Sequence, residues 1–232
     1  MIKSHPSKTI IIFAKYPEPG KVKTRLSSSL GHEQSCLIYQ AMLSDLIDKF
    51  AFQKLFSCCF YIYPPEAATS FSAEYSLSVD NVLPQKGSDL GGRMFNSFME
   101  QISLGFDQIA CFGSDIPAIS LDHIDSAFSA LSSHDAVLGP AEDGGYYLIG
   151  LNKESLCESF FTGIAWSSPS VFSETVSKIK NRGLTHDTIM PLRDLDDLSD
   201  LQFYKNFLNE NRSLSPRLNR ILSEKDYFPD GM

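Results

Sequence analysis

Long apolar runs are missing from this sequence of 232 residues. No stretch approaches the ~20 consecutive apolar residues that a helix needs to cross a bilayer. The apolar run at residues 10–14 is too short for the hydrophobic region of a signal peptide, and Lys15 follows it at once. We therefore expect a cytoplasmic protein with no membrane span.

Cysteine and histidine are sparse and show no ligand pattern. The five cysteines are odd in number and include no CxxC pair, which argues against a zinc finger and against a disulfide framework. The five histidines share no metal-ligand spacing. A GxSxG nucleophile elbow, a GxxxxGKS/T phosphate loop and a GxGxxG motif after the first apolar run are absent as well. Serine hydrolases, P-loop enzymes and dinucleotide-binding dehydrogenases are therefore disfavoured.

Positive charge is scarce overall, because 20 Lys and Arg face 28 Asp and Glu for a net charge of −8. Such a chain is a poor candidate for binding nucleic acid or an anionic membrane. Residues 15–25 run against this background with four cations, namely Lys15, Lys21, Lys23 and Arg25. Two prolines stiffen this loop, and Gly20 lets the backbone approach a ligand. The loop is predicted to bind phosphate groups, with a solvated surface loop as the alternative.

Apolar runs alternate with amphipathic segments along the whole chain. Strands are predicted at residues 9–14, 56–63, 81–83, 108–112, 136–138 and 146–151, and an edge strand within 184–192. Helices are predicted at residues 31–50, 92–104, 120–131, 168–180 and 197–208, and the polar tail after residue 211 is expected to be loosely held. The alternation predicts one α/β domain over residues 1–232, with three α/β/α layers and a mostly parallel sheet.

Three acidic segments could carry chemistry. Asp115 follows the strand at 108–112, so it lies at the sheet edge where ligands bind, and its carboxylate could hold Mg²⁺ or Mn²⁺. The alternative is an Asp that caps the turn before a proline. The segment Glu142-Asp143-Gly144-Gly145 could hydrogen-bond a sugar or another hydroxylated group, and its alternative is a plain hairpin turn.

The third acidic segment holds four acids within residues 194–200. A helix N-terminus, where acids suit the dipole, explains Asp197 and Asp200 better than Asp194 and Asp196. Trp166 could lie beside the site, although a lone tryptophan is more often part of the core.

The motifs AKYPEPGKVKTRL, QKGSDLGGRM, GSDIPAIS, LGPAEDGGYYLIGL, WSS and DLDD occur in this order over residues 9–208. This order resembles a bacterial family of glycosyltransferase-A-like proteins, known as selenodomain-associated or arsenosugar-biosynthesis glycosyltransferases. It is more distantly similar to phospholactate and molybdenum-cofactor guanylyltransferases. The resemblance implies a nucleotide-diphospho-sugar transferase fold. Where the family tends towards Asp-x-Asp-Thr-Pro, this chain has Asp194-Leu195-Asp196-Asp197-Leu198, which leaves open whether Asp194 or Asp196 is a metal ligand.

The resemblance also implies roles for individual residues. Phosphate or substrate binding falls to residues from the first loop and from the later motifs: Lys15, Gly20, Lys21, Lys23, Arg25, Gln85, Arg93, Glu142, Gly144 and Gly145. Asp115 and Asp196 match the metal ligands, with Asp196 the better match for the second, and Asp143 faces the sugar or acceptor. Catalysis would depend on Asp115, Lys23 and Asp143.

The expected function is metal-dependent transfer from a nucleotide-activated donor to a small-molecule acceptor, with Mg²⁺ or Mn²⁺ as cofactor. A glycosyltransferase that uses a nucleotide-sugar is favoured. The alternatives are a nucleotidyltransferase that takes a nucleoside triphosphate and releases pyrophosphate, and a nucleotide-binding module without catalysis. The base, the sugar, the acceptor and the choice between a monomer and a homodimer are left open by the sequence.

Overall fold

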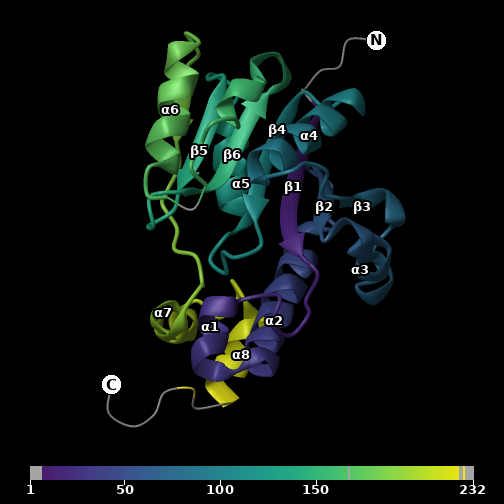
Figure 1. Cartoon of the computed structure of the whole chain (residues 1–232), viewed down its shortest axis with the longest axis vertical. Helices are drawn as coiled ribbons and strands as arrows, with labels where there is room; N and C mark the ends of the chain where they lie inside the picture. Colours follow the sequence, from purple (N-terminus) through teal and green to yellow (C-terminus); the bar gives the residue numbers. More distant parts are fainter. Residues whose placement is uncertain (1–6, 167, 225–226, 228–232) are drawn as a thin grey trace.

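A seven-stranded sheet forms the centre of the computed structural model, which describes residues 7–166, 168–224 and 227 (Figure 1). The strand order is β3-β2-β1-β4-β6-β5-β7. The strands are β1 (Lys8–Lys15), β2 (Ser57–Tyr63), β3 (Val82–Pro84), β4 (Gln108–Gly113), β5 (Ala136–Pro140), β6 (Tyr146–Asn152) and β7 (His186–Thr188). Only β6 runs antiparallel to its neighbours in the described sheet, pairing with β4 and β5. The mostly parallel sheet predicted from the sequence is confirmed.

The central strands are apolar on both faces because helices cover both sides of the sheet. Ile10, Ile11 and Ile12 of β1 are all 0% exposed. In the parallel register, Phe13 of β1 lies opposite Gly113 of β4. The chain therefore leaves β1 and β4 at the same sheet edge, and the segments after these two strands become neighbours.

Two helical layers sandwich the sheet. The helices are α1 (Thr24–Leu30), α2 (His32–Phe50), α3 (Ala68–Glu74), α4 (Leu90–Ser103), α5 (Leu121–Ala130), α6 (Val171–Asn181), α7 (Leu198–Glu210) and α8 (Pro216–Glu224). Short 3₁₀ turns lie at Pro65–Ala67, Val79–Asn81, Lys153–Ser155 and Glu158–Phe160. Helices α2, α3 and α5 pack on the face that carries Ile10 and Ile12, whereas α4 and α6 pack on the face that carries Ile11. None of the helices in the described part of the chain has the length and hydrophobicity needed to cross a membrane.

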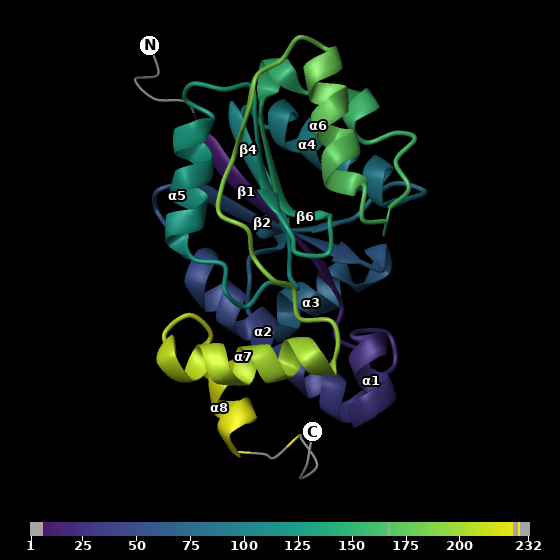
Figure 2. The same ribbon diagram turned by 90° about the vertical axis from the view of Figure 1, so that its left-hand side faces the viewer.

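A third apolar cluster lies beyond the carboxyl end of β1, where α1, α2, α7 and α8 meet (Figure 2). The expectation of a loosely held tail is wrong for residues 212–224, because Leu218 and Leu222 of α8 are 0% and 1% exposed in this cluster. The same expectation for residues 225–226 and 228–232 lies outside the described residues. Asp45 of α2 anchors α8 by accepting the backbone N–H groups of Arg217 and Leu218 at 3.1 and 3.0 Å. Helix α8 is thus packed against the core.

The segment before α2 also departs from the prediction. The helix predicted at residues 31–50 is confirmed as α2, but the separate helix α1 before it was not predicted. Gly31 separates the two helices with a φ of +80°, a conformation that side chains disfavour. The short helix α3 was not predicted either, because seven residues carry too little periodicity to be recognised.

Candidate functional site

Lys23 closes the loop between β1 and α1 in a constrained conformation. Its φ of 48° and ψ of 47° lie in the left-handed region that residues other than glycine rarely adopt. Its carbonyl accepts the backbone N–H of Ser27 at 2.8 Å, so that Lys23 is the N-cap of α1. Its side chain is only 2% exposed. Strained residues of this kind concentrate at functional sites.

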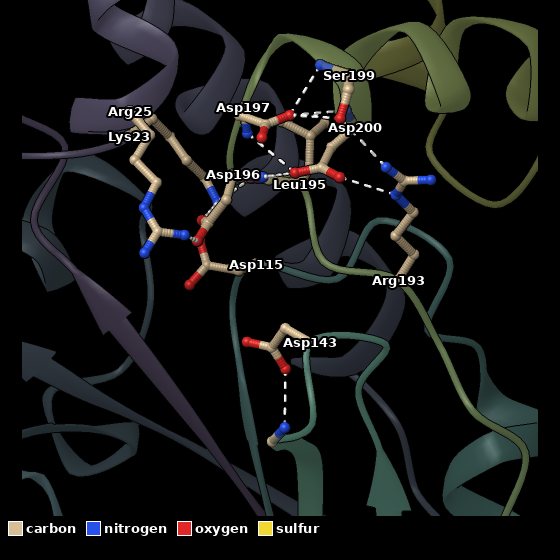
Figure 3. A network of polar contacts seen from close by, with 11 residues as sticks. Lys23, Arg25, Asp115, Asp143, Arg193, Leu195, Asp196, Asp197, Ser199 and Asp200 are labelled. Carbon is tan, nitrogen blue, oxygen red and sulfur yellow. Dashed lines mark hydrogen bonds and ion pairs between the residues drawn. The ribbon is translucent and has the colours of Figure 1, made fainter. Parts of the chain in front are cut away.

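The Lys23 ammonium group joins three distant parts of the chain (Figure 3). Nζ contacts Asp115 Oδ1 in the segment after β4, and it donates to the carbonyl of Leu195 at 2.6 Å. Asp196 Oδ1 lies 3.5 Å from the same Nζ, and Asp196 Oδ2 lies 3.6 Å from Nη1 of Arg25. The structure thus brings together Lys23, Arg25, Asp115 and Asp196, four residues singled out in the sequence.

A hydrogen-bond network fixes the position of Asp196 (Figure 3). Asp200 Oδ2 accepts the backbone N–H groups of Asp196 and Asp197 at 2.8 and 3.0 Å. Asp200 Oδ1 accepts Nε of Arg193 at 2.8 Å. Asp197 in turn caps α7 through the N–H groups of Ser199 and Asp200. The helix-terminus interpretation of Asp197 and Asp200 is therefore confirmed, and these two acids hold the backbone that presents Asp196.

Asp115 and Asp196 suit a divalent cation. Carboxylate oxygens are the ligands that Mg²⁺ and Mn²⁺ prefer, and these two carboxylates lie close enough to contact one ammonium group. Within residues 7–166, 168–224 and 227, no group of three or more His, Cys, Asp or Glu side chains is placed to hold a metal. A metal at Asp115 and Asp196 would take its other ligands from substrate phosphates and water, which is the common arrangement for Mg²⁺.

A groove of about 810 Å³ opens beside these residues and is called the basic groove here. Its cations come from β1, the first loop, α1 and α4. The residues that line it are Phe13, Ala14, Lys15, Val22, Lys23, Thr24, Arg25, Tyr39, Tyr63, Gln85, Asp89, Leu90, Arg93, Gly113, Ser114, Asp115, Trp166 and Asp196. Four cations face three acids in this lining, so the groove is net positive in a chain with a net charge of −8.

The floor of the basic groove is held rigidly. The carboxamide of Gln85 is buried, and its Nε2 donates to the carbonyls of Tyr61 and Ala14 at 2.9 and 3.3 Å. The hydroxyl of Tyr39 accepts the backbone N–H of Lys15 at 2.9 Å and lies 2.8 Å from Ser114 Oγ. Burial, together with the nearby charge of Asp115, raises the pKa of Tyr39, so this phenol stays neutral.

Arg93 of α4 also lines the groove. Its guanidinium carbon is 4.7 Å from the centre of the Tyr63 ring, a cation–π arrangement. Its Nε donates to the carbonyl of Asp89 at 3.1 Å, which leaves the terminal nitrogens for a ligand. Arg93 therefore presents positive charge from α4 towards the same space as Lys15 and Arg25.

A second cavity of about 330 Å³, called the acidic chamber here, adjoins the groove. Its lining combines aromatic rings with the carboxylates of Asp115, Asp143 and Asp194. The lining residues are Phe13, Leu90, Met94, Cys111, Phe112, Gly113, Asp115, Ile116, Ala141, Asp143, Gly145, Tyr146, Tyr147, Trp166, Ser168, Val171 and Asp194. Burial, followed by the charges of Asp196 and Asp143, raises the pKa of Asp194 to about 6. The carboxylates therefore lie close enough to repel one another.

The turn between β5 and β6 shapes one side of the chamber. Asp143 Oδ1 accepts the backbone N–H of Gly145 at 2.9 Å. Gly144 has a φ of +90°, and a Cβ there would lie 2.3 Å from the carbonyl oxygen of Pro169. Only glycine fits this close approach, which brings the turn against the segment before α6.

Some predicted residues lie outside both cavities. Gly20 and Lys21 belong to the turn of the first loop, and neither lines the groove. Glu142 is exposed and lies 3.9 Å from Nε of Arg193, and Gly144 shapes its turn without lining the chamber. The structure therefore assigns these four residues a position near the site but no surface within it.

Comparison with known proteins identifies relatives of this chain. The chain matches the family described as "Uncharacterized protein conserved in bacteria (DUF2064)" over residues 56–168. A search of the curated proteins finds no match. The crystal structure of a protein from Desulfovibrio desulfuricans G20, named provisionally as a nucleotide-diphospho-sugar transferase, is 32% identical to the chain. The alignment covers 95% of each chain, with a TM-score of 0.85. The chain belongs to the family of this nucleotide-diphospho-sugar transferase-like protein.

More distant structures share the fold of this transferase-like family. The 4-diphosphocytidyl-2C-methyl-D-erythritol synthase of Anaerococcus prevotii DSM 20548 is 9% identical, with a TM-score of 0.57 over 88% of this chain and 99% of that chain. The inositol-1-phosphate CTP transferase of T. maritima is 11% identical, with a TM-score of 0.53 over 92% of this chain and 97% of that one. At such identities the likeness concerns the fold alone.

The sequence analysis missed several residues of the site in this transferase-like chain or favoured another position for them. Trp166 lies in the wall shared by the two cavities, where a core position had been favoured. Tyr39 resembled one more apolar position of α2, and nothing in its spacing indicated a groove. The ring of Tyr146 packs edge-on to that of Trp166, with 6.4 Å between ring centres. The one available signal was the GGYY segment, which places Tyr146 directly after a turn already suspected of binding a ligand.

Proposed function

We propose that the protein is a metal-dependent transferase that binds a nucleotide-activated donor in the basic groove. The observation that supports this most strongly is the convergence of Lys23, Asp115 and Asp196 at the edge of a groove with four cations. This groove lies at the carboxyl ends of β1 and β4, where α/β sheets bind their ligands. The family relationship to a nucleotide-diphospho-sugar transferase-like protein supports the same class of donor.

Each residue of the groove would have a separate task. Lys15, Arg25 and Arg93 would bind the donor phosphates, and the fork of donors in arginine suits phosphate oxygens. Lys23 would neutralise the charge that grows on the leaving phosphate. Asp115 and Asp196 would hold Mg²⁺ or Mn²⁺, which supplies Lewis-acid stabilisation of that charge when bound.

Gln85 and Asp143 would orient the two substrates. The amide nitrogen of Gln85 is already used by two carbonyls, so its oxygen is the atom left for a donor group on the nucleotide. Asp143 lines the acidic chamber, next to Asp115, and would accept a hydrogen bond from a hydroxyl of the acceptor. We favour glycosyl transfer, in which a nucleoside diphosphate leaves.

Nucleotidyl transfer is the second candidate. The four cations of the groove suit a triphosphate as well as a diphosphate, and in that reaction pyrophosphate would leave. The two reactions differ in their products, so identification of the released phosphate compound separates them.

The first test is a thermal-shift screen of the protein with Mg²⁺ or Mn²⁺ against nucleotide-sugars and nucleoside triphosphates. A ligand at about 100 times its Kd adds roughly 2.7 kcal/mol, which raises the Tm of a chain of this size by about 5 to 10 °C. A metal-dependent shift with one nucleotide-sugar identifies the donor of a glycosyltransferase, and a shift with a triphosphate alone favours nucleotidyl transfer. The absence of any shift would refute nucleotide binding in the groove.

The second test replaces one carboxylate. Asp115→Asn should abolish turnover while the protein stays folded, because an amide is a poor ligand for the metal. Asp122→Asn, on the exposed side of α5, is the control and should retain activity. Full metal-dependent turnover by Asp115→Asn would rule out Asp115 as a metal ligand.

A further inference from the structure

The basic groove and the acidic chamber are neighbouring cavities with part of their lining in common. Phe13, Leu90, Gly113, Asp115 and Trp166 line both cavities, so these residues form a shared wall. A molecule in the chamber would therefore touch the same Asp115 that faces the phosphates of a nucleotide in the groove. This is the position required of the second partner in a group transfer.

The two cavities differ sharply in charge. All the lysines and arginines of the described site line the groove, whereas the described residues that line the chamber include no Lys, Arg or His. Apart from Asp115, whose charge is paired with Lys23, the chamber presents the carboxylates of Asp143 and Asp194. Ionised carboxylates accept hydrogen bonds but donate none, so they suit hydroxyl groups and repel a phosphate.

The rest of the chamber lining combines aromatic side chains with aliphatic and small ones. Tyr146 and Trp166 lie edge to face, and Phe112 and Tyr147 line the same cavity. Flat aromatic faces beside hydrogen-bond acceptors suit a ring that has both C–H faces and hydroxyl edges. The volume of about 330 Å³ lies at the small end of ligand sites, which run from about 300 to 1,000 Å³.

We propose that the acidic chamber binds an uncharged, hydroxyl-rich single ring and rejects phosphate esters. This inference rests on the proposed function, because it takes the basic groove as the nucleotide site. The proposal excludes a phosphate monoester as the second substrate. A nucleotidyl transfer that forms a diphosphate bridge would need such a monoester as its acceptor. The proposal thereby favours glycosyl transfer to or from an uncharged sugar or polyol.

Saturation-transfer NMR on the full chain tests the proposal. The groove is first filled with Mg²⁺ and a nucleoside diphosphate, so that added phosphates cannot bind there. Methyl glucoside, methyl galactoside and inositol are then compared with glucose 6-phosphate, galactose 6-phosphate and inositol 1-phosphate. We expect at least one uncharged ring to bind at least tenfold more tightly than its phosphate.

Two variants connect this signal to the chamber. Asp143→Asn keeps the oxygen that accepts the N–H of Gly145, so the turn should stay intact while one negative charge is lost. Asp143→Asn should reduce the ratio of the affinity for each uncharged ring to the affinity for its phosphate at least threefold. Asp122→Asn should leave this affinity ratio unchanged. Trp166→Ala should weaken the binding of the uncharged ring.

The outcomes separate the two proposals. Equal or tighter binding of the phosphates, or no binding of any uncharged ring, would overturn the chamber proposal even if the nucleotide binds. If the nucleoside diphosphate in the same sample gives no binding signal, the proposed function is overturned instead. Replacing the nucleoside diphosphate with the matching nucleotide-sugar identifies the source of the ring: loss of the methyl glycoside signal means that the sugar of the donor fills the chamber, and persistence means that the acceptor does.

Discussion

Replacement of Lys23 by methionine would remove the charge that connects the first loop to the segment after β7. Methionine keeps most of the length and apolar volume of the side chain but has no ammonium group. Three acceptors would lose their partner at once, namely Asp115 Oδ1, the carbonyl of Leu195 and Asp196 Oδ1. Lys21→Met is the matched control, because Lys21 lies two residues away in the same loop, is exposed and lines neither cavity.

The size of the effect follows from exposure. Hydrogen bonds to charged groups contribute about 1.5 to 3 kcal/mol, and removal of one partner of a fully buried ion pair costs about 3 to 5 kcal/mol. The Lys23 side chain is 2% exposed, but those of Asp115 and Asp196 are 48% and 38% exposed and can recover hydration. We therefore expect a loss of about 1 to 3 kcal/mol. At about 2 to 4 °C per kcal/mol, the Tm should fall by several degrees in Lys23→Met and stay unchanged in Lys21→Met.

The same pair of variants tests the proposed role of Lys23 towards phosphate. Loss of one charge-assisted contact should weaken nucleotide binding by roughly 10- to 100-fold at low salt, and less at high salt because ions screen the contact. Isothermal titration of both variants at two salt concentrations measures this. Equal nucleotide affinity and equal Tm in Lys23→Met and Lys21→Met would refute both the structural and the functional reasoning.

Three further predictions concern packing and protonation. Gly91→Ala should destabilise the protein by several kcal/mol, because its Cβ would lie 2.0 Å from the carbonyl oxygen of Phe161. Gly92→Ala has 3.4 Å to its nearest neighbour and should gain up to about 1 kcal/mol of stability from helix propensity. Urea unfolding compares the two variants. Leu218→Ala should cost about 2 to 5 kcal/mol in the same assay, and a cost near zero would contradict the packing of α8. Burial lowers the pKa of Lys49 to about 8, below its value in the unfolded chain. Between pH 8 and about 10.5 the unfolded state therefore binds more protons than the folded state. Because of this difference, the contribution of Lys49 to the free energy of unfolding should increase as the pH rises. The difference in unfolding free energy between the wild type and Lys49→Met should therefore rise by about 1 to 2 kcal/mol from pH 8 to pH 9.5, and a constant difference would contradict the lowered pKa.

The sheet and one edge of the site could be predicted because their signals are local. A β-branched run such as Ile10–Ile12 indicates a buried strand by itself, and the parallel order places the residues that follow β1 and β4 at one edge. Lys15 and Asp115 could therefore be assigned to one neighbourhood from the sequence alone. Asp196 was harder to place, because its partner Lys23 lies more than 170 residues away in the chain.

Other features depend on tertiary contacts that leave no periodic trace. Trp166 joins the wall of the site because Gly91 allows it to approach: a Cβ on Gly91 would lie 2.9 Å from the indole ring. Helix α8 has only nine residues, and its two buried leucines become informative only beside the face of α2 that receives them. The division of the site into a groove with four cations and a chamber without any likewise appears only when segments from four strands and four helices are assembled.

The contact between Lys23 and Leu195 also determines how late in the synthesis of the chain the site can be completed. All seven strands are complete by residue 188, yet the carbonyl of Leu195 and the carboxylate of Asp196 come later in the chain. During synthesis the sheet could therefore form while its lysine at the edge still lacks two of its three partners. A fragment that ends at residue 190 could have all seven strands and still lack the Leu195 carbonyl and the Asp196 carboxylate at the donor site. Secondary-structure content is therefore a poor measure of the ability of this protein to bind its donor.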